Sequence, residues 1–340
     1  MDRTLAILQD IMSSHRNALS GFPAPERPLP PVDAEVQGRL RPLLRLIDAI
    51  EQRYGIDVSS QGTDKLVLRF ASMSTVELGD WVDCLDSLPW ADERWLSLIE
   101  AVTVHETYVM RDRSQLDLFA SLIPAMVDEA LNNRTFMLRF WSAGCATGEE
   151  AYSIAALVLD ALERAGHARA TPTSTVLNPP WRIEVVGSDI SRRALARARS
   201  AVYDTGPLSS FRDGSESAGR HFPRAPGSTG RRSVRTPHPD LRAVVRFVHG
   251  NLVAEDASMP ACEAVFCRNV LMYFSKHGRR RALDNLARAV RPGGCLVLGP
   301  TDSPTDSPTD SPTGSPTDTA PFDALWGTDA VVYRRRADHD

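Results

Sequence analysis

The residues best suited to chemistry lie where an apolar run meets a helical one, at 141–155, which reads WSAGCATGEEAYSIA. Gly144 permits a turn that a ligand can approach closely, and the first amides of the following helix would point at that ligand. The helix opens with Glu149 and Glu150. These carboxylates would repel a pyrophosphate, but they suit a cationic ligand rich in hydroxyl and amine donors, such as S-adenosylmethionine. Capping of the helix by the two glutamates is the alternative explanation.

A second acidic group follows the next apolar run, in the segment GSDIS at 187–191. Asp189 would lie at the carboxyl end of a strand, where open α/β sheets bind ligands and where an acid can accept hydrogen bonds from ribose hydroxyls. It lies farther from the glycine turn than the usual spacing of about 20 residues. The polar, proline-containing insertion 167–180 accounts for that excess. Asp189 could instead cap the helix expected to begin at residue 191.

Two further apolar runs also end in polar residues. Asn251 follows one of them, and its amide can recognise an adenine edge as donor and acceptor together. Arg268 and Asn269 follow the other run. Taken singly, each of these residues fits an ordinary turn equally well.

The elements that must position these residues fall into two patterns. From about residue 36 to residue 100, apolar residues recur at helical spacing, which predicts a small all-α domain. Beyond residue 135, short apolar runs alternate with helical ones, which predicts a mostly parallel sheet with helices on its faces. The expected organisation is a tail and proline-rich linker at 1–33, a helical domain at 34–100, an interdomain segment at 101–134, and an α/β domain at 135–336 with an arginine-rich insertion at about 207–242 and a disordered repeat loop at 301–318.

Composition excludes several classes of protein. With 340 residues, 42% hydrophobic and 24% charged, the chain is neither wholly disordered nor fibrous. No apolar run approaches the roughly 20 residues that span a bilayer, so we expect a cytoplasmic protein without membrane insertion. The net charge of -4 does not favour a nucleic-acid partner. Residues 191–250 alone carry 12 arginines against 4 acidic residues, which suits either an acidic protein surface or a solvated loop.

The five cysteines are scattered, with no spacing typical of metal ligands, so we expect no metal site. Cys145, Cys267 and Cys295 lie in or beside apolar runs. We therefore expect them to be small buried hydrophobic residues and not nucleophiles.

Six segments in order resemble the CheR family of chemotaxis receptor methyltransferases: WSAGCATGEEAYSIA, GSDIS, ARSAVY, VRFVHGNL, VFCRNVLMYF and RPGGCLVLG. Residues 107–112, TYVMRD, are similar to the family's interdomain segment, and the likeness extends from about Leu43 to Arg336. The resemblance implies a seven-stranded, Rossmann-like S-adenosylmethionine-dependent methyltransferase domain preceded by a small all-α domain. It also implies O-methylation of glutamate side chains on the cytoplasmic helices of chemoreceptors, the methyl-accepting chemotaxis proteins.

Site residues follow from the resemblance position by position. Arg111 and Tyr273 would face the transferring methyl group. Together with Gly144 of the glycine turn, the cofactor-binding residues would be Thr107, Arg111, Glu150, Asp189, Asn251, Leu252, Arg268 and Asn269. A glutamate acceptor has a pKa of about 4.3 and is ionised at neutral pH, so the reaction needs no general base.

The chain departs from the family at several positions. His105 stands where the family usually has Asn, Ala151 where it commonly has Pro, and 299–302 reads GPTD in place of a Gly-His-Ser-Glu segment. The family's receptor-docking β subdomain can correspond only to the arginine-rich stretch near 212–246. Two other functions therefore stay open: a methyltransferase of another protein or small molecule on the same scaffold, and a catalytically weak, cofactor-binding signalling protein.

Overall fold

The computed structural model divides the chain into two compact units. One contains the chain up to Val104 together with Tyr273–Arg279, and the other contains His105–Met272 together with the chain from Arg280 onward. No helix among the described residues is long and apolar enough to cross a membrane. The structure describes residues 34–58, 60–171, 174–212, 219–225, 233–255, 257, 259–300, 302, 304 and 322–336.

The first unit is helical, as the apolar spacing predicts. A capping box starts α4, because Ser74 and Glu77 each accept a hydrogen bond from the other's backbone N–H. Asp92 caps α5 by accepting from the N–H of Arg94. The buried side chains of Ile50 and Trp95 belong to the core of this unit. Its helices are α2 (Ala34–Tyr54), α3 (Ser60–Arg69), α4 (Thr75–Asp86) and α5 (Glu93–Val102).

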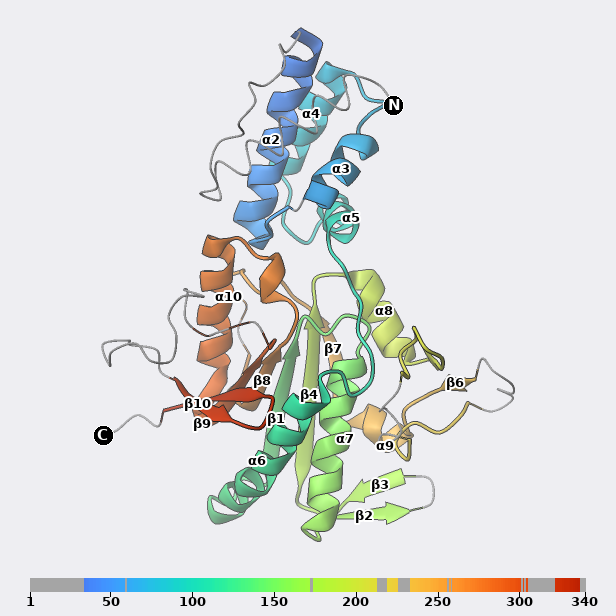
Figure 1. The fold of residues 1–340 in the computed structure, drawn as a ribbon, viewed down its shortest axis with the longest axis vertical. Helices are drawn as coiled ribbons and strands as arrows, with labels where there is room; N and C mark the ends of the chain where they lie inside the picture. The colour runs from blue at the N-terminus through green and yellow to red at the C-terminus, as the bar shows by residue number, and fades with distance from the viewer. Residues whose placement is uncertain are drawn as a thin grey trace. The chain divides into compact units, whose positions relative to one another are not determined.

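The second unit is built on a seven-stranded sheet with the order β10-β11-β9-β8-β1-β4-β7 (Figure 1). The strands from β7 to β9 pair in parallel, whereas β11 is antiparallel to both of its neighbours. This confirms the predicted α/β class with a mostly parallel sheet. The strands are β1 (Met137–Ala143), β4 (Arg182–Asp189), β7 (Val245–His249), β8 (Cys262–Cys267), β9 (Val290–Leu298), β10 (Phe322–Trp326) and β11 (Val331–Arg335).

Two helices, α6 and α7, pack side by side against the sheet (Figure 1). On α6, the Phe119 ring makes edge-to-face contacts with Phe140 of β1 and Phe266 of β8, at centroid distances of 5.9 and 4.9 Å. Almost every residue of α7 is buried, because its sequence is apolar around most of its circumference. The helices outside the first unit are α6 (Arg113–Asn132), α7 (Glu149–Arg164), α8 (Arg192–Ser200) and α9 (Pro239–Ala243); η2 (Leu271–Tyr273) and α10 (Lys276–Ala289) include residues of both units.

Several segments differ from expectation. The stretch 101–134, predicted to be an interdomain segment, contains α6, whose apolar side chains join the core of the second unit. The polar insertion 167–180 forms a hairpin of β2 (Ala168–Thr171) and β3 (Ser174–Leu177). Its β-branched Thr and Val residues favour strands despite the prolines nearby. β5 (Tyr203–Asp204), which precedes the arginine-rich insertion, pairs with β6 (Val234–Arg235) inside it.

Two predicted segments lie mostly or wholly outside the described residues. Nothing of the tail and linker at 1–33 is described. Of the repeat tract 301–318, the structure describes residues 302 and 304. Asp302 is buried, and its N–H donates to the carbonyl of Gly299 at 2.9 Å. The predicted disorder therefore does not hold at Asp302, which the structure places against the fold.

The order of the strands indicates where on the sheet a ligand would bind. β1 has β4 and then β7 on one side, and β8 and then β9 on the other, so the chain changes direction across the sheet at β1. Ligands of open α/β sheets bind at the carboxyl ends of the strands beside such a switch point. Gly144, Asp189 and Arg268 all lie at these strand ends.

A glycine in β4 tests how tightly this region is packed. A Cβ added at Gly187 would lie 2.7 Å from ring atoms of Phe247 and 3.0 Å from Sγ of Cys145. We expect Gly187→Ala to lower the free energy of unfolding by about 1–3 kcal/mol through overpacking, measured by urea denaturation. Gly79→Ala in α4 is the control, because nothing lies within 4 Å of its added Cβ. It should leave stability unchanged or raise it by up to about 1 kcal/mol; Gly187→Ala matching Gly79→Ala would contradict the packing described.

Candidate active site

The turn after β1 is fastened to the end of β4. Gly144 has a φ of +75°, which favours glycine, and the N–H groups of Gly144 and Cys145 donate to the carbonyl of Ser188 at 2.8 and 2.9 Å. The next N–H, that of Ala146, donates to Oδ2 of Asp189 at 2.8 Å. The predicted glycine turn and the predicted acid therefore lie in direct contact.

Asp189 is buried and accepts backbone hydrogen bonds on both carboxylate oxygens. Besides Ala146, the N–H of Ser191 donates to its Oδ1 at 2.9 Å. Ser191 itself caps α8 by accepting from the N–H of Ala194, so Asp189 is not the helix cap. The Nδ1 of His105 lies 3.7 Å from the same Oδ1. Each carboxylate oxygen has a further lone pair with which it can accept from a ligand.

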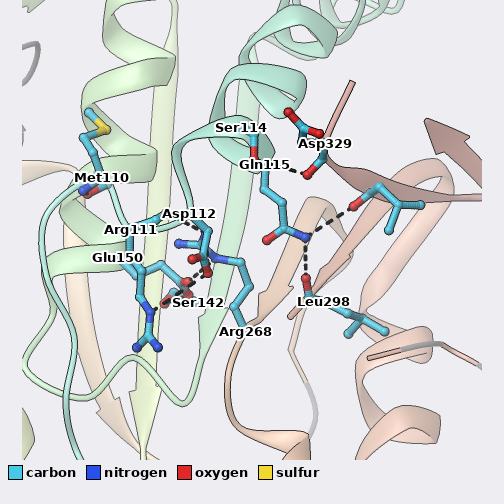
Figure 2. Close-up of polar contacts among 12 residues, drawn as sticks. Met110, Arg111, Asp112, Ser114, Gln115, Ser142, Glu150, Arg268, Leu298 and Asp329 are labelled. Atoms are coloured by element: carbon cyan, nitrogen blue, oxygen red, sulfur yellow. Dashed lines mark hydrogen bonds and ion pairs between the residues drawn. The ribbon is translucent and has the colours of Figure 1, made fainter. Parts of the chain in front are cut away.

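A buried ion pair joins Glu150 to Arg268, as Figure 2 shows. Nε of Arg268 donates to Oε2 of Glu150 at 2.7 Å, and the hydroxyl of Ser142 donates to Oε1 at 2.7 Å. The side chains of Arg268 and Glu150 are 1% and 9% exposed. Nη1 of Arg268 also donates to the carbonyl of Arg111 at 2.8 Å. One pair thereby connects β1, α7, the end of β8 and the segment before α6.

That segment, His105–Asp112, crosses the site and is called the strap below. It is attached to α7, since the N–H of Met110 donates to the hydroxyl of Ser153 in that helix at 3.0 Å. Asp112 has a positive φ of 52°, and its Oδ2 lies 3.7 Å from Nη1 of Arg268. The side chain of Arg111 is partly exposed, and its Nη1 donates to the carbonyl of Glu106.

Glu149 has a different role from its neighbour Glu150. Its carboxylate is buried and accepts from the hydroxyls of Thr147 and Ser210, both at 2.6 Å. Ser210 also accepts from the N–H of Val109 in the strap at 2.8 Å, through its carbonyl. Burial raises the pKa of Glu149 above the usual value of 4.5. Glu149 therefore ties the glycine turn, the strap and the start of the arginine-rich insertion together.

The other predicted site residues lie in different parts of the structure, in a turn, in the strap and in the first unit. Asn251 is buried and its Oδ1 accepts from the N–H of Val253 at 3.2 Å, which is a turn contact. The carbonyl of Leu252 accepts from the side chain of Asn285 at 2.7 Å. Thr107 is a partly buried residue of the strap. Tyr273 belongs to the first unit, where its carbonyl accepts from the N–H of Asp57 at 2.9 Å.

Asn269 and Gln115 each hold a buried oxygen with no hydrogen-bond partner among the described residues. Asn269 follows β8 in the left-handed conformation, with a φ of 58°. Gln115, at the start of α6, donates from Nε2 to the carbonyl of Leu298 at 2.7 Å (Figure 2). Gln115 could not be predicted from the sequence, because one glutamine in an amphipathic helix carries no signal of its own.

The cysteines behave as predicted for buried apolar residues. Cys145, Cys267 and Cys295 are buried, and burial raises the pKa of the Cys145 thiol well above its usual value. Thiols of this kind are poor nucleophiles. Within the described part of the chain, no three His, Cys, Asp or Glu side chains are grouped so that they could hold a metal.

These residues fit a ligand with hydroxyl and amine donors. Asp189 offers anionic oxygens at the end of β4, and Asn269 has a buried Oδ1 that no described group satisfies. A buried acceptor of this kind is normally hydrogen-bonded, so a donor from a ligand would complete it. The glycine turn after β1, the acid at the end of β4 and the mostly parallel seven-stranded sheet together define a Rossmann-like domain with a ligand site at its strand ends.

Comparison with known proteins places the chain more narrowly. Residues 105–313 match the family described as "CheR methyltransferase, SAM binding domain". The chain is 30% identical over 264 residues to "Chemotaxis protein methyltransferase" of Escherichia coli strain K12, covering 76% of this chain and 83% of that protein. It is 31% identical over 215 residues to "Chemotaxis protein methyltransferase 2" of Vibrio cholerae, covering 62% of this chain and 66% of that protein.

A third relative, "Chemotaxis protein methyltransferase Cher2" of Pseudomonas putida, is 31% identical over 229 residues, covering 66% of this chain and 75% of that protein. The chain therefore belongs to the CheR methyltransferase family, and its cofactor is S-adenosylmethionine. Both predictions from the sequence are confirmed.

The raised pKa of Glu149 makes stability depend on pH in a defined direction. The folded state holds the proton of this carboxyl more tightly than the unfolded state, so its contribution is full below the usual value of 4.5 and is lost as the pH rises. Gln cannot ionise, and its amide can still bond to Thr147 and Ser210. We expect Glu149→Gln to gain stability relative to the wild type as the pH is raised above 4.5, measured by urea denaturation from pH 4 to 8.

Glu77→Gln is the control of opposite sign. The backbone hydrogen bond from Ser74 holds the pKa of Glu77 below its usual value, so its contribution is present at neutral pH and is lost in acid. Its Gln variant should therefore lose stability relative to the wild type as the pH rises. Parallel stability profiles for Glu149→Gln and the wild type would show that Glu149 is not the buried, destabilised carboxylate described.

Proposed function

We propose that this protein is a protein-glutamate O-methyltransferase that acts on the cytoplasmic helices of chemoreceptors. The observation that carries the proposal is the position of Arg111. Its carbonyl accepts from buried Arg268 at the end of β8, while its guanidinium stays partly exposed and donates to the carbonyl of Glu106. A cation held there can orient an acceptor carboxylate. Three relatives named chemotaxis protein methyltransferases support a chemoreceptor substrate.

The cofactor-binding role of the strand-end residues is part of the proposal. When bound, S-adenosylmethionine supplies a methyl group on a positively charged sulfur. Asp189 would accept from its hydroxyl groups and Asn269 from one of its donors, which satisfies the buried Oδ1. Glu150 and Arg268 would act mainly by shaping the site, since each already bonds to the other. Thr107, Gly144, Asn251 and Leu252 complete the proposed set.

The proposed reaction requires little acid–base catalysis by residues of this chain. The acceptor glutamate is ionised at neutral pH and would itself be the nucleophile toward the methyl group that bound S-adenosylmethionine would supply, so the chain needs to provide no general base. The protein must align the carboxylate and remove part of its water, an effect that reaches about 7–11 kcal/mol in well-oriented reactions. Arg111 must hold the carboxylate loosely, because tight ground-state binding would slow attack. We also propose that Tyr273 donates a hydrogen bond from its hydroxyl group. A cytoplasmic location is a separate part of the proposed function.

The chemical nature of the product tests the proposed function. Labelled S-adenosylmethionine should give a base-labile methyl ester on glutamate in receptor-containing membranes. Arg111→Ala should lower the single-turnover rate about 10- to 100-fold, the effect of losing a hydrogen bond to a charged group. Tyr273→Phe should lower it less, because the ring remains.

Arg113→Ala is the matched control, because Arg113 is exposed two residues away and pairs with Asp117. Its rate should equal that of the wild type. An alkali-stable methyl group, on nitrogen or carbon, would instead support a methyltransferase of another substrate on this scaffold. Absence of any transferred label would favour the cofactor-binding signalling protein.

A further inference from the structure

Two arginines share one aromatic ring at the edge of the proposed site. The guanidinium carbon of Arg212 lies 4.6 Å from the centroid of the Tyr108 ring, and that of Arg111 lies 5.6 Å from the same centroid. Arg111 and Tyr108 belong to the strap, whereas Arg212 lies in the arginine-rich insertion. The hydrogen bond from the N–H of Val109 to the carbonyl of Ser210 holds these two segments together.

Two like charges so close together repel, and Glu106 offsets that repulsion. Its Oε1 accepts from Nη2 of Arg212 at 2.7 Å, and its carbonyl accepts from Nη1 of Arg111 at 2.9 Å. The hydrogen bond from Arg212 and its charge hold the pKa of Glu106 below the usual value. The chain itself therefore places a carboxylate, that of Glu106, beside the guanidinium groups of Arg111 and Arg212.

Another carboxylate can displace that of Glu106 from Arg212, whereas Arg212 itself is held in place. The Glu106 side chain is 65% exposed, whereas that of Arg212 is 25% exposed. Arg212 also packs on Tyr108, and its Nε donates to the carbonyl of Ser209 at 3.1 Å. Exposed ion pairs contribute little to stability, so another carboxylate can displace Glu106 at small cost. An arginine positioned in advance loses less entropy when it binds a carboxylate.

We propose that Arg212 binds a second acidic side chain of the substrate, next to the acceptor glutamate, and that Glu106 occupies this position when no substrate is bound. The inference rests on the proposed function, in which Arg111 orients the acceptor. Both guanidinium carbons lie within 5.6 Å of one ring centroid, so they are no more than about 10 Å apart and the two carboxylates that bind them must be near neighbours. Side chains three or four residues apart on a helix, with Cβ atoms about 5–6 Å apart, meet that requirement.

The substrate class is therefore narrower than any exposed glutamate. A helical segment with a pair of acidic residues one turn apart should be preferred over one with an isolated glutamate. Arg212 acts in recognition and not on the reacting atoms, so its loss should appear in KM and leave kcat nearly unchanged.

The test uses the full chain, labelled S-adenosylmethionine and a chemoreceptor cytoplasmic fragment whose methyl-accepting positions are all glutamate. Arg212→Gln should raise KM for the fragment about five- to tenfold, with kcat within about twofold and the affinity for S-adenosylhomocysteine unchanged. Glu106→Gln should lower KM, because the internal competitor is weakened. Arg336→Gln is the matched control, since Arg336 forms an exposed pair with Asp323 at 2.9 Å in the same unit; its KM should equal that of the wild type.

A double-mutant cycle across the interface identifies the partner of Arg212. In the fragment, each acidic residue within one turn of an acceptor is changed to Gln in turn. One such change should raise KM for the wild type and have no further effect on Arg212→Gln. An unchanged KM for Arg212→Gln, or additive effects at every position, would overturn the inference while leaving the proposed function intact. If the wild type does not methylate the fragment at all, the proposed function fails and the inference fails with it.

Discussion

The buried pair between Glu150 and Arg268 is the interaction on which the site depends. Taking two charges out of water costs several kcal/mol per ion, and the pair recovers that cost only when its remaining hydrogen-bonding groups are satisfied. Here Ser142 satisfies one carboxylate oxygen, and the carbonyl of Arg111 accepts from the guanidinium. Because each partner comes from a different element, the pair can form only when β1, α7, the end of β8 and the strap are all in place.

Two neighbouring buried acids extend this arrangement. Glu149 accepts from Thr147 and Ser210, and Asp189 accepts from Ala146 and Ser191. Together the three carboxylates fix the glycine turn on one side and the strap on the other. Their hydrogen bonds leave Arg111 partly exposed and its main chain fixed, which is the condition for a cation that orients a substrate without moving far itself.

Local patterns in the sequence predicted the frame of the site but not its contacts. Strand ends followed by Gly, Asp or Arg-Asn were recognisable, because parallel strands collect their carboxyl ends at one edge. The partner of Arg268 was not predictable, since Glu150 lies 118 residues earlier and no local rule pairs them. The same holds for Ser210 and Glu149, which are 61 residues apart.

Secondary structure, too, was predictable where its signals are local in sequence and was missed where they are not. The helix predicted to open with Glu149 and Glu150 is present as α7, because its start signals and apolar pattern are local. The hairpin within 167–180 was missed, because prolines and polar residues obscure two strands of only four residues each. The place of Tyr273 in the first unit was also missed: it depends on backbone contacts with residues near Asp57, far away in sequence.

The most direct test of the central claim is a double-mutant cycle on the buried pair. The free energy of unfolding would be measured in urea, without cofactor, for the wild type, Glu150→Gln, Arg268→Gln and the double variant. Each single variant should lose about 3–5 kcal/mol, because it leaves an unpaired buried charge. The double variant should lose less than the two together, by at least about 1 kcal/mol. Losses that add to within about 0.5 kcal/mol would contradict the claim that this pair holds the site together.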